Sequence, residues 1–263
     1  MAIESINNQN NFVSSNVQPS ASAQALASGS RINQSADDPS GQAVVTAMTS
    51  QINMQDQGVR NANDGINMMQ TADGAMQNMA SQMQTLSGLS VQAMNGTYNE
   101  SQRQAMNQQF MQTVQGIEQI AQTTQFNGMN LLNGENSELS IALGDSDSKV
   151  SMFDFSNANT GLDGLNLSSP SAARAANDAL TEVMDQLKES QATVGAQQNG
   201  LTSAAENLMS QNVNTQASRA QINDTDYAQS VTERTREQVL QQAQIAMQAQ
   251  SNQSQGDVLQ LLS

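Results

Sequence analysis

Apolar residues recur every three or four positions over a long stretch of the chain, the spacing that places side chains along one side of an α-helix. The stretch follows Pro39-Ser40-Gly41 and stops at Asn95-Gly96, a dipeptide typical of a left-handed turn after a helix. We predict one helix of about fifty residues, roughly 75 Å long at 1.5 Å per residue. Apart from Gln55 and Asp73, its stripe consists of Val45, Met48, Ile52, Val59, Ala62, Ile66, Met69, Met76, Ala80 and Met83.

The same spacing predicts two more helices. One begins near Ser101 and ends before Asn127-Gly128, and the other covers residues 173–208 with interruptions at Ser190 and Gln197. Each stripe occupies only about two positions in seven, too few to stabilise a lone helix in water, so the three helices are expected to pack together with Met filling the gaps. The stripe of the last helix includes Leu180, Val183, Leu187, Val194, Leu201 and Leu208. We call the stripes of the first and the last helix together the seam.

Between the second and third helices the apolar period changes from about 3.6 to 2. Alternating apolar residues before and after Gly144-Asp145-Ser146-Asp147 predict a β-hairpin at about residues 137–156. The expected fold is mostly α, a long bundle resembling a coiled coil with one small hairpin.

Both ends of the chain carry apolar residues on an almost uncharged background. Residues 1–30 contain one charged residue, Glu4, and residues 237–263 contain only Glu237 and Asp257. Neither end can form a core alone, so we expect both to be unstructured in an isolated molecule and helical when packed against other copies. The residues expected to pack there are Ile3, Ile6, Phe12, Val13, Val17, Leu26, Val239, Leu240, Ile245, Met247, Val258, Leu259, Leu261 and Leu262.

Composition removes most chemical functions. The 263-residue chain has no His and no Cys, which excludes His acid–base catalysis, Cys nucleophiles and the common zinc, haem and iron–sulfur sites. A formal charge of −15 opposes binding to nucleic acids or anionic membranes, and no apolar run is long enough for a membrane span. We therefore predict a protein that is not an enzyme and that holds no cofactor and no metal.

The remaining candidate sites have simpler structural interpretations. Asp145 and Asp147 lack the further ligands that a cation site needs and are expected in a turn. Asp37 and Asp38 precede Pro39 and are expected to cap the first long helix. A stripe of methionines, Met48, Met69, Met76, Met79 and Met83, could hold copper through thioether sulfurs, but packing in the core is the favoured interpretation.

Several strings resemble one protein family over most of the chain. ASGSRINQSADDPSGQAV, RNANDGINMMQTADGAM, LSVQAMNGT and TTQFNGMNLLNG resemble the amino-terminal region of bacterial flagellins. ASRAQINDTDYAQS and REQVLQQAQIAMQAQSNQSQGDVLQLLS resemble the carboxy-terminal region. The resemblance fails only across about residues 156–173.

The resemblance implies a subunit of the flagellar filament, a helical propeller, of the short type without outer surface domains. Residues 1–40 and 225–263 would form the inner, filament-core domain, and residues 41–224 the surrounding rod with its hairpin. The implied partners are copies of the same chain, the flagellar type III export apparatus, a flagellin-specific chaperone, and the filament cap and hook-junction proteins. The implied location is the extracellular filament, reached without a cleaved signal peptide.

One segment implies weak recognition by the animal Toll-like receptor for flagellin. In flagellins that this receptor detects, the segment matching residues 84–92 carries two Arg and a Glu. Here the segment contains Gln84, Thr85, Ser87, Gly88 and Leu89, which cannot make charge-assisted bidentate contacts.

Three other functions stay open at this point. A hook–filament junction protein is related to flagellin at both ends but forms a short ring. A cytoplasmic signalling coiled coil of the chemoreceptor type would share the Gln, Ala and Met content. A hydrolase using Asp and Ser would need a cleft that the sequence does not indicate.

Overall fold

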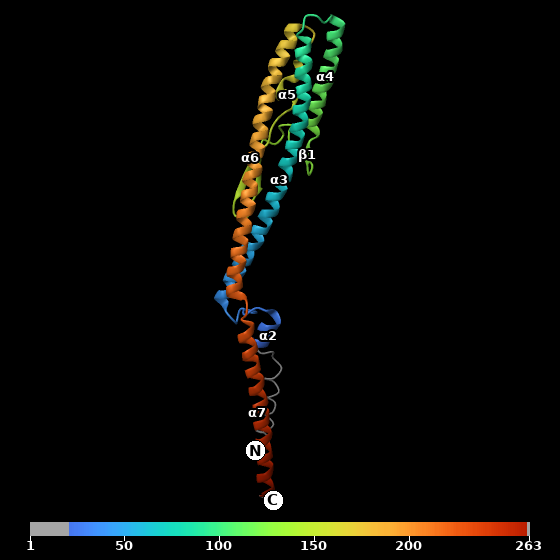
Figure 1. The fold of residues 1–263 in the computed structure, drawn as a ribbon. Coiled ribbons are helices and arrows are strands. Elements are labelled where there is room, and N and C mark those ends of the chain that lie inside the picture. Colours follow the sequence, from blue (N-terminus) through green and yellow to red (C-terminus); the bar gives the residue numbers. More distant parts are fainter. Residues whose placement is uncertain (1–20, 262–263) are drawn as a thin grey trace. The chain divides into compact units, whose positions relative to one another are not determined.

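The structure, a computed structural model, describes residues 21–261 and is predominantly helical (Figure 1). The chain divides into two compact units, one of residues 53–212 and the other of the described residues before and after them. The elements in order are α2 (Ala21–Ser28), α3 (Pro39–Ala93), α4 (Glu100–Thr123), β1 (Gln125–Phe126), β2 (Met129–Asn130), β3 (Glu138–Ala142), β4 (Asp147–Ser151), α5 (Asn157–Thr160), the 3-10 turn η1 (Leu162–Gly164), α6 (Pro170–Asn223) and α7 (Tyr227–Leu261).

The predicted mostly α fold with long helices and a hairpin is confirmed. The first long helix, α3, begins at Pro39, where the missing N–H of proline costs nothing. Asp38 caps it, because its Oδ1 accepts a hydrogen bond of 2.8 Å from the N–H of Gly41. The helix ends at Ala93, just before the predicted Asn95-Gly96 turn.

The second helix, α4, begins with a capping box. The side chain of Asn99 accepts a hydrogen bond from the backbone N–H of Gln102, and the side chain of Gln102 accepts one from the backbone N–H of Asn99. The helix ends at Thr123, and a further hairpin of β1 and β2 follows, which the sequence pattern did not predict. Asn127 and Gly128 both adopt positive φ, 49° and 80°, as a two-residue hairpin turn requires.

The core of the unit of residues 53–212 is built mainly from aliphatic and Met side chains of α3, α4, α6 and the hairpins. Phe110 of α4 is fully buried against this core. The buried methionines of α3 belong to this core, where they fill the space between the helices. They are Met68, Met69, Met76, Met79 and Met83.

The third long helix, α6, continues through the two polar positions that interrupt its stripe. Ser190 is buried and Gln197 is half-buried, yet the helix runs on to Asn223, beyond the predicted end near Leu208. A polar side chain inside a helix interface does not break the backbone hydrogen bonds of the helix, so the interruption marks a weaker contact and no helix end.

Both ends of the chain correct the expectation that they are unstructured in an isolated molecule, because residues 21–28 form α2 and α7 is a helix over residues 227–261 in the single chain. The start of α7 is fixed by Asp226, whose Oδ1 accepts hydrogen bonds from the N–H groups of Ala228 and Gln229 at 3.0 and 3.1 Å. Its many Gln and Ala residues have high helix propensity, which explains a helix without a core of its own. Across the described residues, no helix is both long and apolar enough to cross a membrane.

Candidate assembly surfaces

Helices α2 and α7 pack against each other. Ala25 of α2 is buried and Leu26 is half-buried in this pair. The hydroxyl of Ser22 donates a hydrogen bond of 2.7 Å to Oε2 of Glu237, although the two residues lie 215 positions apart. Glu237 therefore helps to hold α2 on α7.

Beyond α2, helix α7 exposes large apolar side chains. Val239, Leu240, Ile245 and Met247 are 58, 51, 54 and 71% exposed. At about 100° per residue, Val239, Leu240 and Met247 share one face of the helix, whereas Ile245 lies on another. A helix with apolar residues on more than one face is suited to burial among several neighbours.

A groove of about 470 Å³ runs between α2 and α7. Ala23, Leu26, Ala27 and Val231 supply apolar side chains to it, and Arg234 supplies a guanidinium. A partner for this groove needs an apolar surface next to a carboxylate or a carbonyl oxygen.

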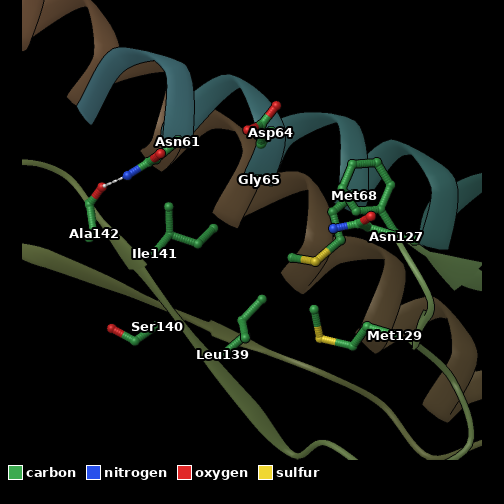
Figure 2. A pocket seen from close by; sticks show the side chains of 11 residues that line it. Asn61, Asp64, Gly65, Met68, Asn127, Met129, Leu139, Ser140, Ile141 and Ala142 are labelled. Carbon is green, nitrogen blue, oxygen red and sulfur yellow. Dashed lines mark hydrogen bonds between the residues drawn. The ribbon is translucent and has the colours of Figure 1, made fainter. Parts of the chain in front are cut away.

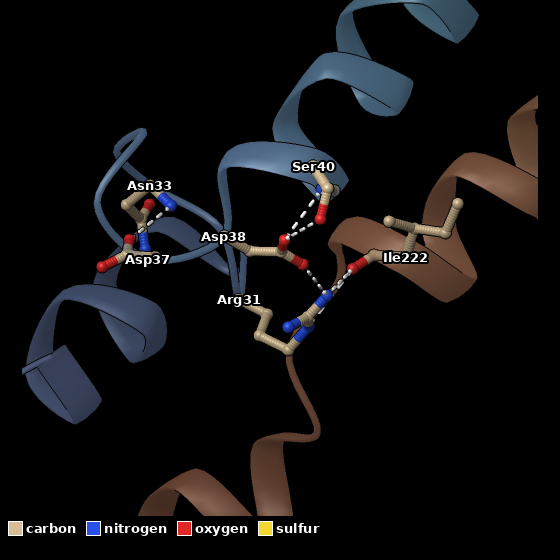
Figure 3. Close-up of polar contacts among 7 residues, drawn as sticks. Arg31, Asn33, Asp37, Asp38, Ser40 and Ile222 are labelled. Carbon is tan, nitrogen blue, oxygen red and sulfur yellow. Dashed lines mark hydrogen bonds and ion pairs between the residues drawn. The ribbon is translucent and has the colours of Figure 1, made fainter.

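Arg31 links the start of α3 to the end of α6, an arrangement that we call the Arg31 clasp (Figure 3). Its Nη2 donates to the carbonyl oxygen of Ile222 at 2.8 Å and lies 3.5 Å from Oδ2 of Asp38. A cation at a helix carboxy terminus satisfies the free carbonyl groups there and the helix dipole. One side chain thus serves the caps of both long helices.

Asp37 and Asp38, in the loop between α2 and α3, have different roles. The N–H of Gly41 and the hydroxyl of Ser40, ahead of Arg31, hold the pKa of Asp38 below its usual value. The N–H groups of Asn33 and Gln34 hold the pKa of Asp37 below its usual value, so Asp37 orders the loop and does not cap α3. Both contributions to stability are present at neutral pH and are lost as the pH falls through these lowered pKa values.

The hairpin of β3 and β4 packs directly against α3, at two glycines seven residues apart. A Cβ atom on Gly58 would lie 2.8 Å from the carbonyl carbon of Leu143, and one on Gly65 would overlap Cδ1 of Ile141. The side chain of Asn61, between the glycines, donates a hydrogen bond of 2.8 Å to the carbonyl oxygen of Ala142. We call this arrangement the glycine seat of the hairpin.

A groove of about 730 Å³ lies next to the glycine seat, between α3 and the two hairpins (Figure 2). Met68, Met129 and Leu139 line its apolar part. Asp64 and Asn127 lie at its polar side, so the groove has no set of convergent catalytic groups. Over the described residues, no three His, Cys, Asp or Glu side chains are placed to hold a metal ion.

The structure places the predicted seam residues at different depths. In the unit of residues 53–212 the half-buried members are Val59, Ile66 and Leu208, and the buried ones are Met69, Met76, Met83, Leu180, Val183, Leu187, Val194 and Leu201. In the other unit Ile52 is buried, and Val45 and Met48 are half-buried.

A polar layer interrupts the seam between α3 and α6. Nε2 of Gln55 donates to Oε1 of Gln211 at 3.5 Å, and Nδ2 of Asn212 donates to Oδ1 of Asp56 at 2.9 Å. Gln55 and Asn212 are only 4 and 6% exposed. These four residues form what we call the polar layer.

The predicted terminal packing residues are only partly visible. Leu26 and the four exposed α7 residues are described above. The side chains of Ile3, Ile6, Phe12, Val13, Val17, Val258, Leu259, Leu261 and Leu262 lie outside the described part of the structure.

The segment that corresponds to the receptor epitope lies on α3. Gln84, Thr85 and Gly88 are exposed, and Leu89 is half-buried. The hydroxyl of Ser87 donates a hydrogen bond of 3.1 Å to Oδ1 of Asn177 on α6, so Ser87 is engaged within the subunit.

Sequence reasoning missed the Arg31 clasp and the glycine seat. The clasp has no local signal, because Arg31 and Ile222 are 191 positions apart. The seat has one, since two glycines seven residues apart in a helix interior each cost about 1 kcal/mol of helix propensity and indicate a close contact.

Comparisons with known proteins cover nearly the whole chain. Residues 1–137 match the model of the bacterial flagellin N-terminal helical region, and residues 177–262 match that of the C-terminal helical region. A flagellin of Halalkalibacterium halodurans is 37% identical over 242 residues, which cover 90% of this chain and 89% of the relative.

Two further relatives bear on the assembly and the fold. The flagellar filament core protein flaB2 of Brachyspira hyodysenteriae is 32% identical over 278 residues, covering 99% of this chain and 98% of that protein. The crystal structure of Bacillus cereus flagellin matches with a TM-score of 0.52 and 25% identity, over 57% of this chain and 88% of that chain.

Proposed function

This chain belongs to the bacterial flagellin family and is a structural subunit of the flagellar filament, and from this premise we propose that its terminal helices join the copies. The match to filament proteins along their length gives the hook-junction alternative no advantage. The chain is a short flagellin without a central domain.

The observation that carries the proposal is the exposed apolar surface of α7. Val239, Leu240, Ile245 and Met247 are all more than half exposed in the single chain. Their burial removes apolar area from water at about 25 cal/mol per Å², and their positions on more than one face need more than one neighbour. These four side chains, together with the apolar residues among residues 1–20 and 258–262, would form the filament-core layer.

The proposed division of the subunit follows from this layer. Residues 1–40 and 225–263 would form the inner layer, and residues 41–224 the surrounding rod, held together by the seam. Contacts between different surfaces of successive copies do not close on themselves, so they produce an open helix. Such a helix is mechanically a screw that a motor elsewhere can turn.

The remaining partners follow from the family and are part of the proposal. The subunit would leave the cell through the flagellar type III export apparatus, without cleavage of an amino-terminal signal, and would meet a flagellin-specific chaperone before export. The filament cap and the hook-junction proteins would contact it at the two ends of the filament. We assign it no catalytic activity, because the family is structural.

Deletion of Val258 to Leu262 tests the proposal. We expect the truncated protein to form no filaments on addition of salt, which screens the charge of −15 per subunit, while the rod stays folded. Negative-stain electron microscopy measures the first effect and thermal unfolding followed by circular dichroism the second. Normal filaments from the truncated protein would refute the assignment of the carboxy-terminal end to the core.

The receptor segment gives a second test. We expect the purified monomer to activate a cell reporter for the Toll-like receptor at least about tenfold less than a flagellin with the charged segment, since a hydrogen bond to a charged group contributes roughly 1.5 to 3 kcal/mol. The control is that charged flagellin at equal monomer concentration in the same cells. Full potency of the present protein would contradict the expectation.

A further inference from the structure

The chain contains four Asn-Gly pairs, which are the dipeptides most prone to spontaneous deamidation because glycine places no Cβ in the path of the attacking nitrogen. They are Asn95-Gly96, Asn127-Gly128, Asn133-Gly134 and Asn199-Gly200. We propose that Asn95, in the turn between α3 and α4, is a site of self-modification that converts to aspartate and isoaspartate ahead of the other three.

The reaction needs water and no other reactant. The backbone nitrogen of Gly96 attacks Cγ of Asn95 and loses its proton, and the side-chain nitrogen gains a proton and leaves as ammonia. The new bond between the Gly96 nitrogen and Cγ of Asn95 closes a five-membered succinimide ring, and the bond between Cγ and Nδ2 of Asn95 breaks. Water opens the ring at either carbonyl group and leaves aspartate or isoaspartate, so one neutral residue becomes one carboxylate.

The turn at Asn95 holds the reacting groups in a favourable state. Oδ1 of Asn95 accepts hydrogen bonds from the N–H and the hydroxyl of Thr97, at 3.1 and 3.0 Å. This oxygen becomes negatively charged during the attack, and hydrogen bonds to a charged acceptor are about twice as strong as neutral ones. The two donors therefore stabilise the transition state more than the starting amide.

The nucleophile and the leaving group of this pair are unengaged. Within residues 21–261, no hydrogen bond involves the Gly96 N–H or Nδ2 of Asn95. Asn95, Gly96 and Thr97 are exposed and lie outside every helix and strand. The Asn95 N–H donates to the Gln92 carbonyl oxygen at 3.2 Å and its carbonyl oxygen accepts the Tyr98 N–H at 3.5 Å, so rotation of the Asn95 backbone for the attack needs only these exposed turn bonds to open.

The hairpin turn holds the second pair in place. Asn127 has a φ of 49° and is flanked by the paired residues Phe126 and Met129, which restrict its rotation. The attack at Asn127 therefore requires the β1–β2 pairing to open first.

The third and fourth pairs are held by other contacts. Oδ1 of Asn133 accepts the N–H of Glu135 much as Oδ1 of Asn95 accepts that of Thr97, but here the leaving group, Nδ2, is also engaged by Oε2 of Glu135 and the Asn133 backbone is bridged to Asp154. Asn199 and Gly200 lie inside α6, where each backbone N–H is part of the helix.

The modification has a local structural consequence. Each conversion adds one negative charge to an exposed turn, and isoaspartate also adds one carbon to the main chain between α3 and α4. A subunit that stays in a long-lived polymer accumulates this change with time, so the state of Asn95 records the age of the subunit.

The test is a time course on the purified full-length protein at mildly alkaline pH, with peptide mapping by mass spectrometry and enzymatic methylation of isoaspartate. We expect Asn95 to convert about tenfold or more faster than Asn199, because a helical N–H reacts only after local opening. In denaturing urea the four pairs should convert at similar rates, which separates the effect of the structure from that of the dipeptide.

Two variants in the turn sharpen the test. Thr97→Val removes one donor and should slow conversion of Asn95 about fivefold, the factor for one hydrogen bond of about 1 kcal/mol. Gly96→Ala should nearly stop it and leave the fold intact, since a Cβ there meets no atom within 4 Å. Equal rates at Asn95 and any other pair in the folded protein, or an unchanged rate in folded Thr97→Val, would overturn the proposal.

Discussion

Replacement of Leu240 and Met247 by glutamate is expected to abolish filament formation and to leave the isolated subunit folded. Both side chains are exposed in the single chain, at 51 and 71%, so the exchange costs the monomer less than about 0.5 kcal/mol. In the polymer the same positions would be buried among apolar neighbours, where an unpaired carboxylate costs several kcal/mol. Sedimentation and electron microscopy measure polymer formation, and thermal unfolding measures the monomer.

A matched control places the same two charges elsewhere. Gln104 and Gln108 are exposed on α4, in the other compact unit, and their exchange for glutamate also lowers the net charge by two. This variant should still polymerise on addition of salt. Filaments from Leu240→Glu/Met247→Glu would show that this face of α7 does not join the copies.

Alanine is expected to have opposite effects at two glycines of α3. In Gly58→Ala the new Cβ meets backbone atoms, the Leu143 carbonyl carbon at 2.8 Å and the Gly144 nitrogen at 3.0 Å, so the hairpin must move from its seat. In Gly74→Ala the Cβ meets nothing within 4 Å. Overpacking costs about 1 to 3 kcal/mol, whereas alanine in place of an open helix glycine stabilises by about 1 kcal/mol.

The free energy of unfolding in urea should therefore differ by about 2 kcal/mol or more between these two variants, with the wild type between them. Hydrogen exchange gives a second readout, because only Gly58→Ala should raise the exchange rates of β3 and β4 amides. If both variants gain stability equally, the hairpin does not rest on Gly58 as described.

The helices were predictable because their signal is local and repeated. An apolar residue every three or four positions, followed by Asn95-Gly96, was enough to place most of α3 and the turn after it. The exact start at Pro39 depended on the cap by Asp38, which the acidic pair before the proline also indicated. The hairpin of β3 and β4 was predictable for the same reason, because apolar and polar residues alternate in the segments before and after the turn at Gly144.

The features that were missed depend on contacts between distant segments or on very short elements. Strands β1 and β2 have two residues each, too few to show a period, so Asn127-Gly128 was interpreted only as the end of a helix. A helical α7 in the single chain was not expected, because the segment has no core of its own, but the helix propensity of its many Gln and Ala residues favours the helix without one.

The candidate surfaces were predictable in kind but not in detail. Low charge with scattered apolar residues indicated that the ends join copies, and the structure supplies exposed examples such as Leu240. The sequence pattern did not indicate that α2 would pack on α7 through Ser22 and Glu237, because no pattern within either segment specifies the other.

The polar layer has a consequence for how the chain finds its alignment. The donors and acceptors that meet there are 156 positions apart, so α3 and α6 meet late and could slide along their uniform Met and Leu stripes. In any shifted alignment the buried side-chain amides of Gln55 and Asn212 would face apolar neighbours without these partners, at a cost of about 1 kcal/mol or more each. The polar layer thus sets the register of α3 against α6. It gives up some stability, and in return one pairing of the two helices is clearly lower in free energy than the shifted ones.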